Sequence, residues 1–310
     1  SVIFQSVIVG VVSCRQTNTP PAIDGVGPSR LQLVPGPWTS ILDALCARFP
    51  AIARVTWQDR FERGRILDHD GRPLHEDAPM RIGAEIFYYR EVVGERSFPV
   101  EEIVLHVDEH LIVVDKPHFL PVVPSGGYVT ETLLARLKRR FGSAEIVPLH
   151  RLDRLTAGLV LFSSNPDSRS RYQSLFRMQR VCKRYEAIAP SSPDNTYPLL
   201  RCSRLEQSVP FFRMCEATGE PNSTTMIDVI ERIDRETWRY ALEPVTGRKH
   251  QLRVHMAALG MPICNDPLYP QLTDRAPDDL GRPLKLLARS LTFTDPLDGT
   301  HKHYESGLNL

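Results

Sequence analysis

The feature that most constrains the fold is a succession of short apolar runs of strand length that begins after residue 102. Runs of roughly four to eight residues rich in Val, Ile and Leu, separated by turn residues, are typical of strands. Residues 103–107 and 111–114 are predicted to pair as a hairpin, and residues 158–163 form a continuous apolar strand. Amphipathic helical stretches lie between these runs, so the pattern indicates a mixed α and β domain.

Helix signals punctuate the same part of the chain. Thr130 is predicted to cap a helix with Leu134, Leu137 and Phe141 on its apolar face. Pro166 suits the first position of a following helix, because that position needs no backbone N–H. The remaining predicted elements are strands at 182–189, 226–230 and 238–242 and a helix at 249–259.

The N-terminal part has a different composition. Residues 15–37 are rich in Pro and Gly and are interpreted as a loose lead-in, and Gly94 to Pro99 as a linker. Between them the periodicity predicts helices at 39–49 and 57–61 and strands at 65–67 and 86–89. We therefore predict an extension (1–37), a small module (38–95) and a large domain (96–310).

Composition excludes several classes of protein. The chain is 42% hydrophobic and 24% charged, as globular proteins are. Its longest apolar stretch, residues 2–12, is shorter than the roughly 18–20 residues of a membrane span and lacks a basic leader. The six cysteines form no C-x-x-C pair, and the spacing of His250 and His255 is not that of a zinc motif. We predict a cytoplasmic protein with reduced thiols, no membrane association, no metal and no cofactor.

Charge is distributed unevenly along the chain. The net charge is only +1, but residues 131–190 contain twelve Lys and Arg against five Asp and Glu. Such a local field attracts a polyanion even when the whole chain is nearly neutral. Solvated helix faces would give the same count, so charge alone leaves nucleic-acid binding open.

Three segments carry the strongest signal: HRLDRLTAGL at 150–159, KRYEA at 183–187 and TGRKHQLRVH at 246–255. In this order and spacing, with Asp-Lys-Pro at 115–117, they resemble the signature motifs of the RluA-type family of RNA pseudouridine synthases. The resemblance covers roughly residues 100–306. It implies an α+β fold, with a mixed, largely antiparallel sheet and flanking helices. The chain departs from the family at Phe119, where many members have Gly, and at Asn265-Asp266, which replaces a common Gly-Asp.

The resemblance implies isomerisation of specific uridines in structured ribosomal or transfer RNA, by an enzyme that is expected to be a monomer. That reaction breaks the C1′–N1 bond, turns the uracil and joins C5 to C1′, with no exchange of electrons. It requires a nucleophilic carboxylate, a proton acceptor for C5 and a water-poor pocket. It requires no redox cofactor, in agreement with the absence of such motifs.

Three residues match the family's catalytic positions. Asp153 is the expected nucleophile, and a carboxylate withdrawn from water needs a nearby cation to stay ionised. Arg253 matches that cation, and a guanidinium can hold a carboxylate at two points. Tyr185 matches the aromatic residue placed against the target base, where it can stack on uracil or relay the C5 proton.

Other matching residues are expected to contact RNA. The target base must leave its stack before reaction, and the resemblance implies that Arg151 fills the vacated space. Phosphate contacts are expected from Lys116, Arg154, Arg248 and Lys249, the last two beside a helix N-terminus. His150, His250 and Gln251 are expected to order the loop and helix.

The small module resembles the S4-like RNA-binding module that precedes the catalytic domain in many family members. The matching features are the helix at Ile41, the segment Arg60 to Gly64, the turn Asp70-Gly71 and the strand at Ile86. The stretch is near neutral, so a spacer or an interaction surface is the alternative interpretation.

Two other functions compete with the isomerase. A catalytically silent RNA-binding or ribosome-assembly protein would have no chemical need for the trio Asp153, Tyr185 and Arg253. A glycosidase-like hydrolase usually needs a second carboxylate near the first. The signature segments offer only Glu186, which alternation places on the opposite strand face from Tyr185.

Overall fold

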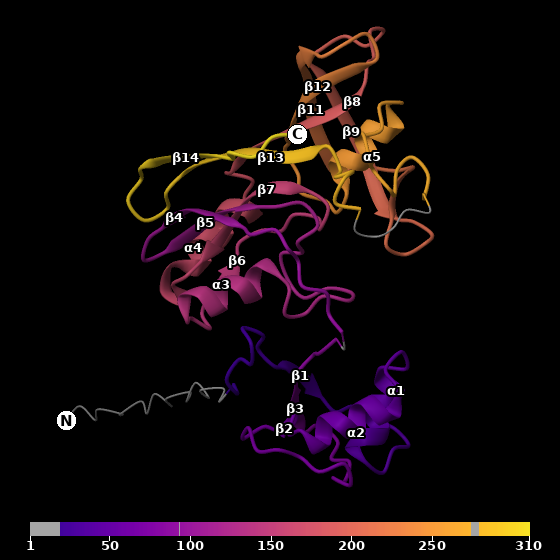
Figure 1. The fold of residues 1–310 in the computed structure, drawn as a ribbon, viewed down its shortest axis with the longest axis vertical. Coiled ribbons are helices and arrows are strands. Elements are labelled where there is room, and N and C mark those ends of the chain that lie inside the picture. The colour runs from indigo at the N-terminus through magenta and orange to yellow at the C-terminus, as the bar shows by residue number, and fades with distance from the viewer. Residues whose placement is uncertain (1–18, 93, 274–278) are drawn as a thin grey trace, which may run out of the picture. The chain divides into compact units, whose positions relative to one another are not determined.

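The computed structural model describes residues 19–92, 94–273 and 279–310. The chain divides between residues 90 and 91 into two compact units (Figure 1). The apolar stretch 2–12 and Cys14 lie outside the described residues. Among those described, no helix is both long and apolar enough to cross a membrane.

The first unit is a three-stranded antiparallel sheet with two helices. Trp57 and Leu45, from the two helices, are fully buried in its core with Ile66. The sheet order is β1-β3-β2. The likeness to an S4-like module stays a prediction. The elements are β1 (Ser29–Gln32), α1 (Ile41–Arg48), α2 (Arg54–Glu62), β2 (Ile66–Asp68) and β3 (Glu85–Tyr88).

Strand β1 corrects the interpretation of residues 15–37 as a loose lead-in. It pairs with β3, so that Leu31 lies opposite Ile86. Leu31 and Leu33 pack on the core of this unit and alternate with more exposed residues, which is strand periodicity. Pro and Gly flank this short strand and masked its signal in the composition.

The second unit contains a sheet of eleven described strands, in the order β10-β9-β11-β12-β8-β13-β7-β5-β4. Strands β14 and β6 pair with β13 and β7. The strand pairs are antiparallel except β7 with β13, so the predicted mixed, largely antiparallel α+β fold is confirmed. The strands are β4 (Ile103–Val107), β5 (Leu111–Lys116), β6 (Val147–Pro148), β7 (Ala157–Ser163), β8 (Cys182–Pro190), β9 (Leu199–Gln207), β10 (Met214–Ala217), β11 (Ser223–Arg232), β12 (Thr237–Pro244), β13 (Leu286–Thr294) and β14 (His301–Glu305).

Three described helices pack on this sheet: α3 (Leu133–Phe141), α4 (Pro166–Arg177) and α5 (Gln251–Ala258). Leu137 of α3 belongs to the core around β5 and β7, and Tyr172 of α4 to a second core that includes other side chains of the same strands. Met256 of α5 packs with side chains of β8, β11 and β12, and Figure 1 shows α5 beside this part of the sheet. The helices therefore bury the apolar faces of the sheet.

The start of α3 differs from the prediction. Thr132, not Thr130, is the N-cap, and its hydroxyl accepts a hydrogen bond from the backbone N–H of Ala135. Thr130 instead donates its hydroxyl and backbone N–H to Glu95. This two-residue shift turns Leu133 and Leu137 inward and leaves Phe141 exposed.

Gly158 fixes the start of β7 against β13. Its φ is +109°, and a Cβ at this position would lie 2.3 Å from the carbonyl oxygen of Ala288. Only glycine allows the two backbones to approach this closely. The loop that carries Asp153 therefore runs into a strand whose position is tightly defined.

The two departures from the family's glycines both have left-handed backbones. Phe119 has φ +68° and Asn265 has φ +64°. Glycine adopts this region freely, Asn tolerates it, and a bulky residue such as Phe rarely enters it. The local chain path at these positions is one that glycine favours, although the residues differ.

Candidate active site

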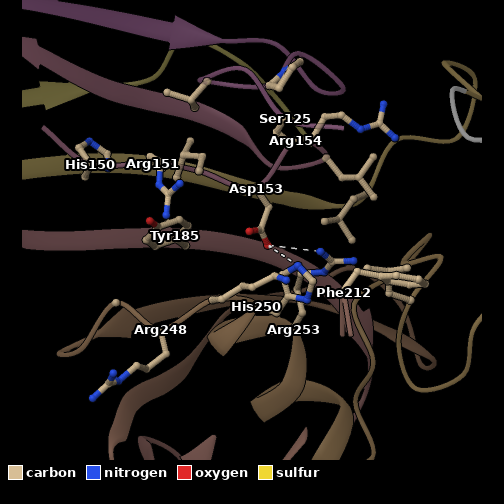
Figure 2. Close-up of a pocket in the computed structure, with 18 of the residues that line it drawn as sticks. Ser125, His150, Arg151, Asp153, Arg154, Tyr185, Phe212, Arg248, His250 and Arg253 are labelled. Carbon is tan, nitrogen blue, oxygen red and sulfur yellow. Dashed lines mark hydrogen bonds and ion pairs between the residues drawn. The ribbon is translucent and has the colours of Figure 1, made fainter. Parts of the chain in front are cut away.

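Asp153 lies in the loop before β7, at a cleft of about 1120 Å³ (Figure 2). The backbone N–H of Thr156 donates to the carbonyl of Asp153 at 3.0 Å and closes a turn. The Asp153 side chain retains 28% of its exposure, so a substrate can reach it. All three signature segments contribute lining residues, which means that the fold brings together motifs that are distant in sequence.

Arg253, in the first turn of α5, contacts Asp153. Its Nη1 donates to Oδ2 of Asp153 at 3.3 Å, and the Arg253 side chain is 2% exposed. The expected two-point grip is not made with Asp153. It is made with Asp266, which accepts hydrogen bonds from Nε at 2.8 Å and Nη2 at 2.7 Å.

Asp266 is a site residue that the sequence reasoning missed. Its side chain is fully enclosed, and one oxygen also accepts the backbone N–H groups of Leu268 and Tyr269. Burial works to lower the pKa of Arg253, but hydrogen bonding and charge from Asp266, and from Asp153, raise it above its usual range. Asp266 thus stabilises the charged Arg253 and fixes its position. In the sequence, the signal that could have identified Asp266 was its place in the run that replaces the family's Gly-Asp.

His250 also faces Asp153, although it was expected only to order the helix. Its Nε2 lies 3.8 Å from Oδ2 of Asp153, and its Nδ1 lies 2.8 Å from the hydroxyl of Tyr269. The Tyr269 oxygen also accepts the backbone N–H of Met214 at 2.8 Å, which fixes the position of its hydroxyl beside Nδ1. Burial lowers the pKa of His250 to about 4. At neutral pH the His250 ring is therefore uncharged.

Tyr185 lines the same cleft from β8 and is half-buried. Burial, and secondarily the charge of Asp153, raise the pKa of its hydroxyl above the usual range. At neutral pH Tyr185 is consequently a phenol and not a phenolate. This favours stacking on a base over direct proton abstraction by an ionised Tyr185.

Lys116 corrects the prediction of a phosphate contact. It is fully buried at the end of β5, and its Nζ donates to the carbonyl oxygens of Pro117 at 2.9 Å and Arg154 at 3.2 Å. Burial lowers its pKa to about 7, against the opposing charge of Asp153. Every residue of β5 is buried, so Lys116 fastens the loop of Asp153 instead of reaching RNA.

The other predicted RNA contacts do line the cleft. Arg151, Arg248 and Lys249 are exposed, and the Arg154 guanidinium lies 5.4 Å from the ring centre of Tyr128. Cations outnumber carboxylates along the described lining, which makes the cleft suited to a polyanion. The cations are Arg151, Arg154, Arg177, Lys183, Arg248, Lys249, Arg253 and Arg282, and the carboxylates are Asp153 and Asp279.

Glu186 is held away from this cleft. Both of its oxygens accept hydrogen bonds from Arg289 at 3.0 Å, and Glu186 is not among the described lining residues. The second carboxylate that a glycosidase needs is therefore not supplied by Glu186. His150 and Gln251 order their loops: His150 accepts the N–H of Leu161, and Gln251 accepts that of Arg248.

Comparison with known proteins gives consistent results. A family model described as RNA pseudouridylate synthase matches residues 110–258. An RNA pseudouridine synthase of Synechocystis, named as uncharacterized, is 32% identical over 235 residues, covering 74% of this chain and 79% of the relative. The dual-specificity RNA pseudouridine synthase RluA of Escherichia coli K12 is 34% identical over 211 residues, covering 66% and 92%. The solved structure of human RNA pseudouridylate synthase domain containing 1 is similar in fold, with a TM-score of 0.55, 24% identity and coverage of 66% and 83%.

Proposed function

The chain belongs to the RluA-type family of RNA pseudouridine synthases, and from this premise we propose that it isomerises specific uridines of structured ribosomal or transfer RNA with Asp153 as the nucleophile. The observation that carries the proposal is the contact of Asp153 with Arg253 in a cleft rich in cations. A partly exposed carboxylate held beside a fixed guanidinium is an arrangement suited to nucleophilic attack.

The proposed reaction begins with attack of an Asp153 oxygen on C1′ of the target uridine. The C1′–N1 bond breaks, and its electron pair leaves with the uracil. The uracil then turns, and C5 attacks C1′ while the bond to Asp153 breaks. Loss of the C5 proton and protonation of N1 complete the isomerisation, so no redox partner is consumed.

Arg253 and His250 support the reacting carboxylate in this scheme. Arg253 donates to Oδ2 of Asp153 at 3.3 Å, and Nε2 of the neutral His250 ring lies 3.8 Å from the same oxygen. Charge-assisted contacts of this kind orient a carboxylate as well as stabilise it. Tyr185, as a neutral phenol, provides a face on which uracil can stack.

We also propose that the target base leaves the RNA stack to reach Asp153. Arg151 supports this step, because its side chain is exposed and lines the cleft two residues from Asp153. A guanidinium can occupy the space left by a base and stack on its neighbours. Arg154, Arg248 and Lys249 are the proposed phosphate contacts.

The proposal is tested by deleting the gene, mapping pseudouridines across total RNA and then complementing with variants. Wild type is expected to restore the missing position, and Asp153→Asn is expected to lose at least about a thousandfold in turnover, as nucleophile removal does in other enzymes. Asp228→Asn, an exposed carboxylate on β11, is the matched control. Near-normal turnover by purified Asp153→Asn would rule out the nucleophile assignment.

A further inference from the structure

The hairpin between β9 and β10 ends in an exposed apolar tip. Val209 is 92% exposed, Phe211 75% and Phe212 37%. Solvent exposure of several large apolar side chains on one loop is unfavourable unless they contact a ligand or partner. The proposed chemistry at Asp153 does not use any of these residues.

Hydrogen bonds within the loop define the conformation of the tip. Arg213 and Ser208 close the loop, since Ser208 N–H donates to the carbonyl of Arg213 at 3.0 Å and Arg213 N–H to that of Pro210 at 2.9 Å. Gln207 donates its side-chain amide to the carbonyl of Phe211 at 2.7 Å. A loop tied in this way presents its aromatic rings with little loss of conformational entropy on binding.

The tip is also anchored to the segment that fixes Arg253. Arg213 donates to the carbonyl of Pro270 at 2.9 Å, and its guanidinium lies 5.1 Å from the ring centre of Tyr269. Met214 N–H donates to the Tyr269 hydroxyl, which in turn contacts His250. The same tyrosine therefore supports both the tip and a ring that faces Asp153.

Phe212 places one edge of the tip in the cleft. It lines the cavity that contains Asp153 and Arg253, and in Figure 2 it lies on the opposite side of Asp153 from Arg151 and Tyr185. Its ring centre is 5.7 Å from that of Phe211, at a near-perpendicular angle of 78°. The aromatic surface thus continues from the cleft wall to the exposed end of the hairpin.

We propose that Phe211 and Phe212 form a stacking site for an unpaired RNA base that flanks the target uridine. Aromatic faces beside a cleft rich in cations are the combination that binds single-stranded nucleic acid, because bases stack while phosphates meet positive charge. A docking site for a protein partner would be expected to be an apolar patch without the neighbouring cations of the cleft, so we favour RNA as the ligand. The inference rests on the proposed function, which supplies RNA as the substrate class. The role that we propose for the tip is to select RNA with unpaired nucleotides beside the modified position.

The test measures binding and not turnover, so it succeeds or fails separately from the role of Asp153. The probes are two fluorescein-labelled RNAs with equal numbers of phosphates: a stem-loop with an unpaired loop of uridines and adenines, and a fully paired duplex. For Phe211→Ala with Phe212→Ala, we expect affinity for the stem-loop to fall roughly 5- to 150-fold, the range for loss of one stacked base. Affinity for the duplex and the melting temperature should stay unchanged.

Three variants sharpen the result. Phe211→Trp should retain stem-loop affinity, because it keeps an aromatic face, whereas Phe211→Leu should lose it despite being apolar. Leu200→Ala, an exposed apolar residue on β9, is the matched control and should bind both probes as wild type does. Equal affinity of the double variant and wild type for the stem-loop would overturn the proposal, and so would full retention by Phe211→Leu, which would indicate an apolar protein partner.

Discussion

Arg253 joins two carboxylates whose surroundings differ sharply. Asp153 is partly exposed and receives one guanidinium hydrogen bond at 3.3 Å, whereas Asp266 is enclosed and receives two, with two backbone N–H donors besides. A carboxylate that accepts four hydrogen bonds in an enclosed site has little freedom to attack a substrate. The comparison teaches that Asp266 builds the site and leaves Asp153 available for chemistry.

The largest effect on folding is expected when the enclosed pair is broken. Asp266→Asn removes the negative charge enclosed beside Arg253 and leaves the longer contact to Asp153 as the ion pair of this guanidinium, so it should lower the free energy of unfolding by about 3–5 kcal/mol. Urea denaturation measures this. Glu216→Gln breaks the more exposed pair with Arg201 and should cost less than about 1 kcal/mol. If Asp266→Asn were no less stable than Asp153→Asn, the division of roles between the two carboxylates would be wrong.

Acidic pH is expected to have the next largest effect on the stability of the fold. Burial lowers the pKa of both His250 and His255 to about 4, so these rings stay neutral in the fold while they take up protons in the unfolded chain below about pH 6.5. The stability that these two rings contribute is therefore complete above that pH and falls as the pH drops. Between pH 6.5 and 5 we expect a loss of about 1–2 kcal/mol for each ring.

Urea denaturation at pH 7, 6 and 5 checks this dependence. His255→Asn should flatten the slope of stability against pH, even if it lowers stability at pH 7. An unchanged slope in that variant would show that His255 does not carry the effect.

Removal of the Tyr269 hydroxyl tests whether its contact with His250 affects the reaction at Asp153. Tyr269→Phe leaves His250 Nδ1 and Met214 N–H without this partner, which should cost about 1–2 kcal/mol and lower turnover. Tyr240→Phe is a matched control, because its hydroxyl donates to the carbonyl of Pro190 within the sheet. We expect a similar loss of stability there with normal turnover; equal turnover losses in both variants would argue against a role for His250.

The smallest expected effect is on the open side of the cleft. Arg248→Ala or Lys249→Ala should leave stability unchanged and reduce the salt dependence of RNA binding by about one unit of log–log slope each. Binding titrations at several salt concentrations measure this. Lys116→Met should lower stability and leave the salt dependence of RNA binding unchanged, because it loses two buried hydrogen bonds and no phosphate contact. A reduced salt dependence of RNA binding by Lys116→Met would show that Lys116 does contact RNA.

The sequence predicted the parts of the site that lie within continuous motifs. The signature segments placed Asp153, Tyr185 and Arg253 among the candidates, and the structure brings all of them to one cleft. The hairpin of β4 with β5 and the helix that starts at Pro166 were also predicted, because local periodicity and a proline at the first helical position determine them.

Other features depend on contacts that no local pattern reveals. Lysines are rarely buried, so Lys116 was assigned to the surface; only the packing of β5 shows otherwise. Asp266 lies outside the recognised segments, and its pairing with Arg253 requires the three-dimensional path of the chain. The cap at Thr132 was missed because Glu95, 35 residues away from Thr130, competes for the Thr130 side chain.

The fixed position of Arg253 has a consequence for the energetics of catalysis. A cation that had to turn toward a developing charge would spend free energy on reorganisation during the reaction, as water does. For Arg253 this cost is met during folding, because Asp266 sets the direction of the guanidinium before any RNA binds. Under the proposed mechanism, such electrostatic preorganisation implies that binding energy from the RNA is left for moving the base and is not needed to assemble the pair of Asp153 and Arg253.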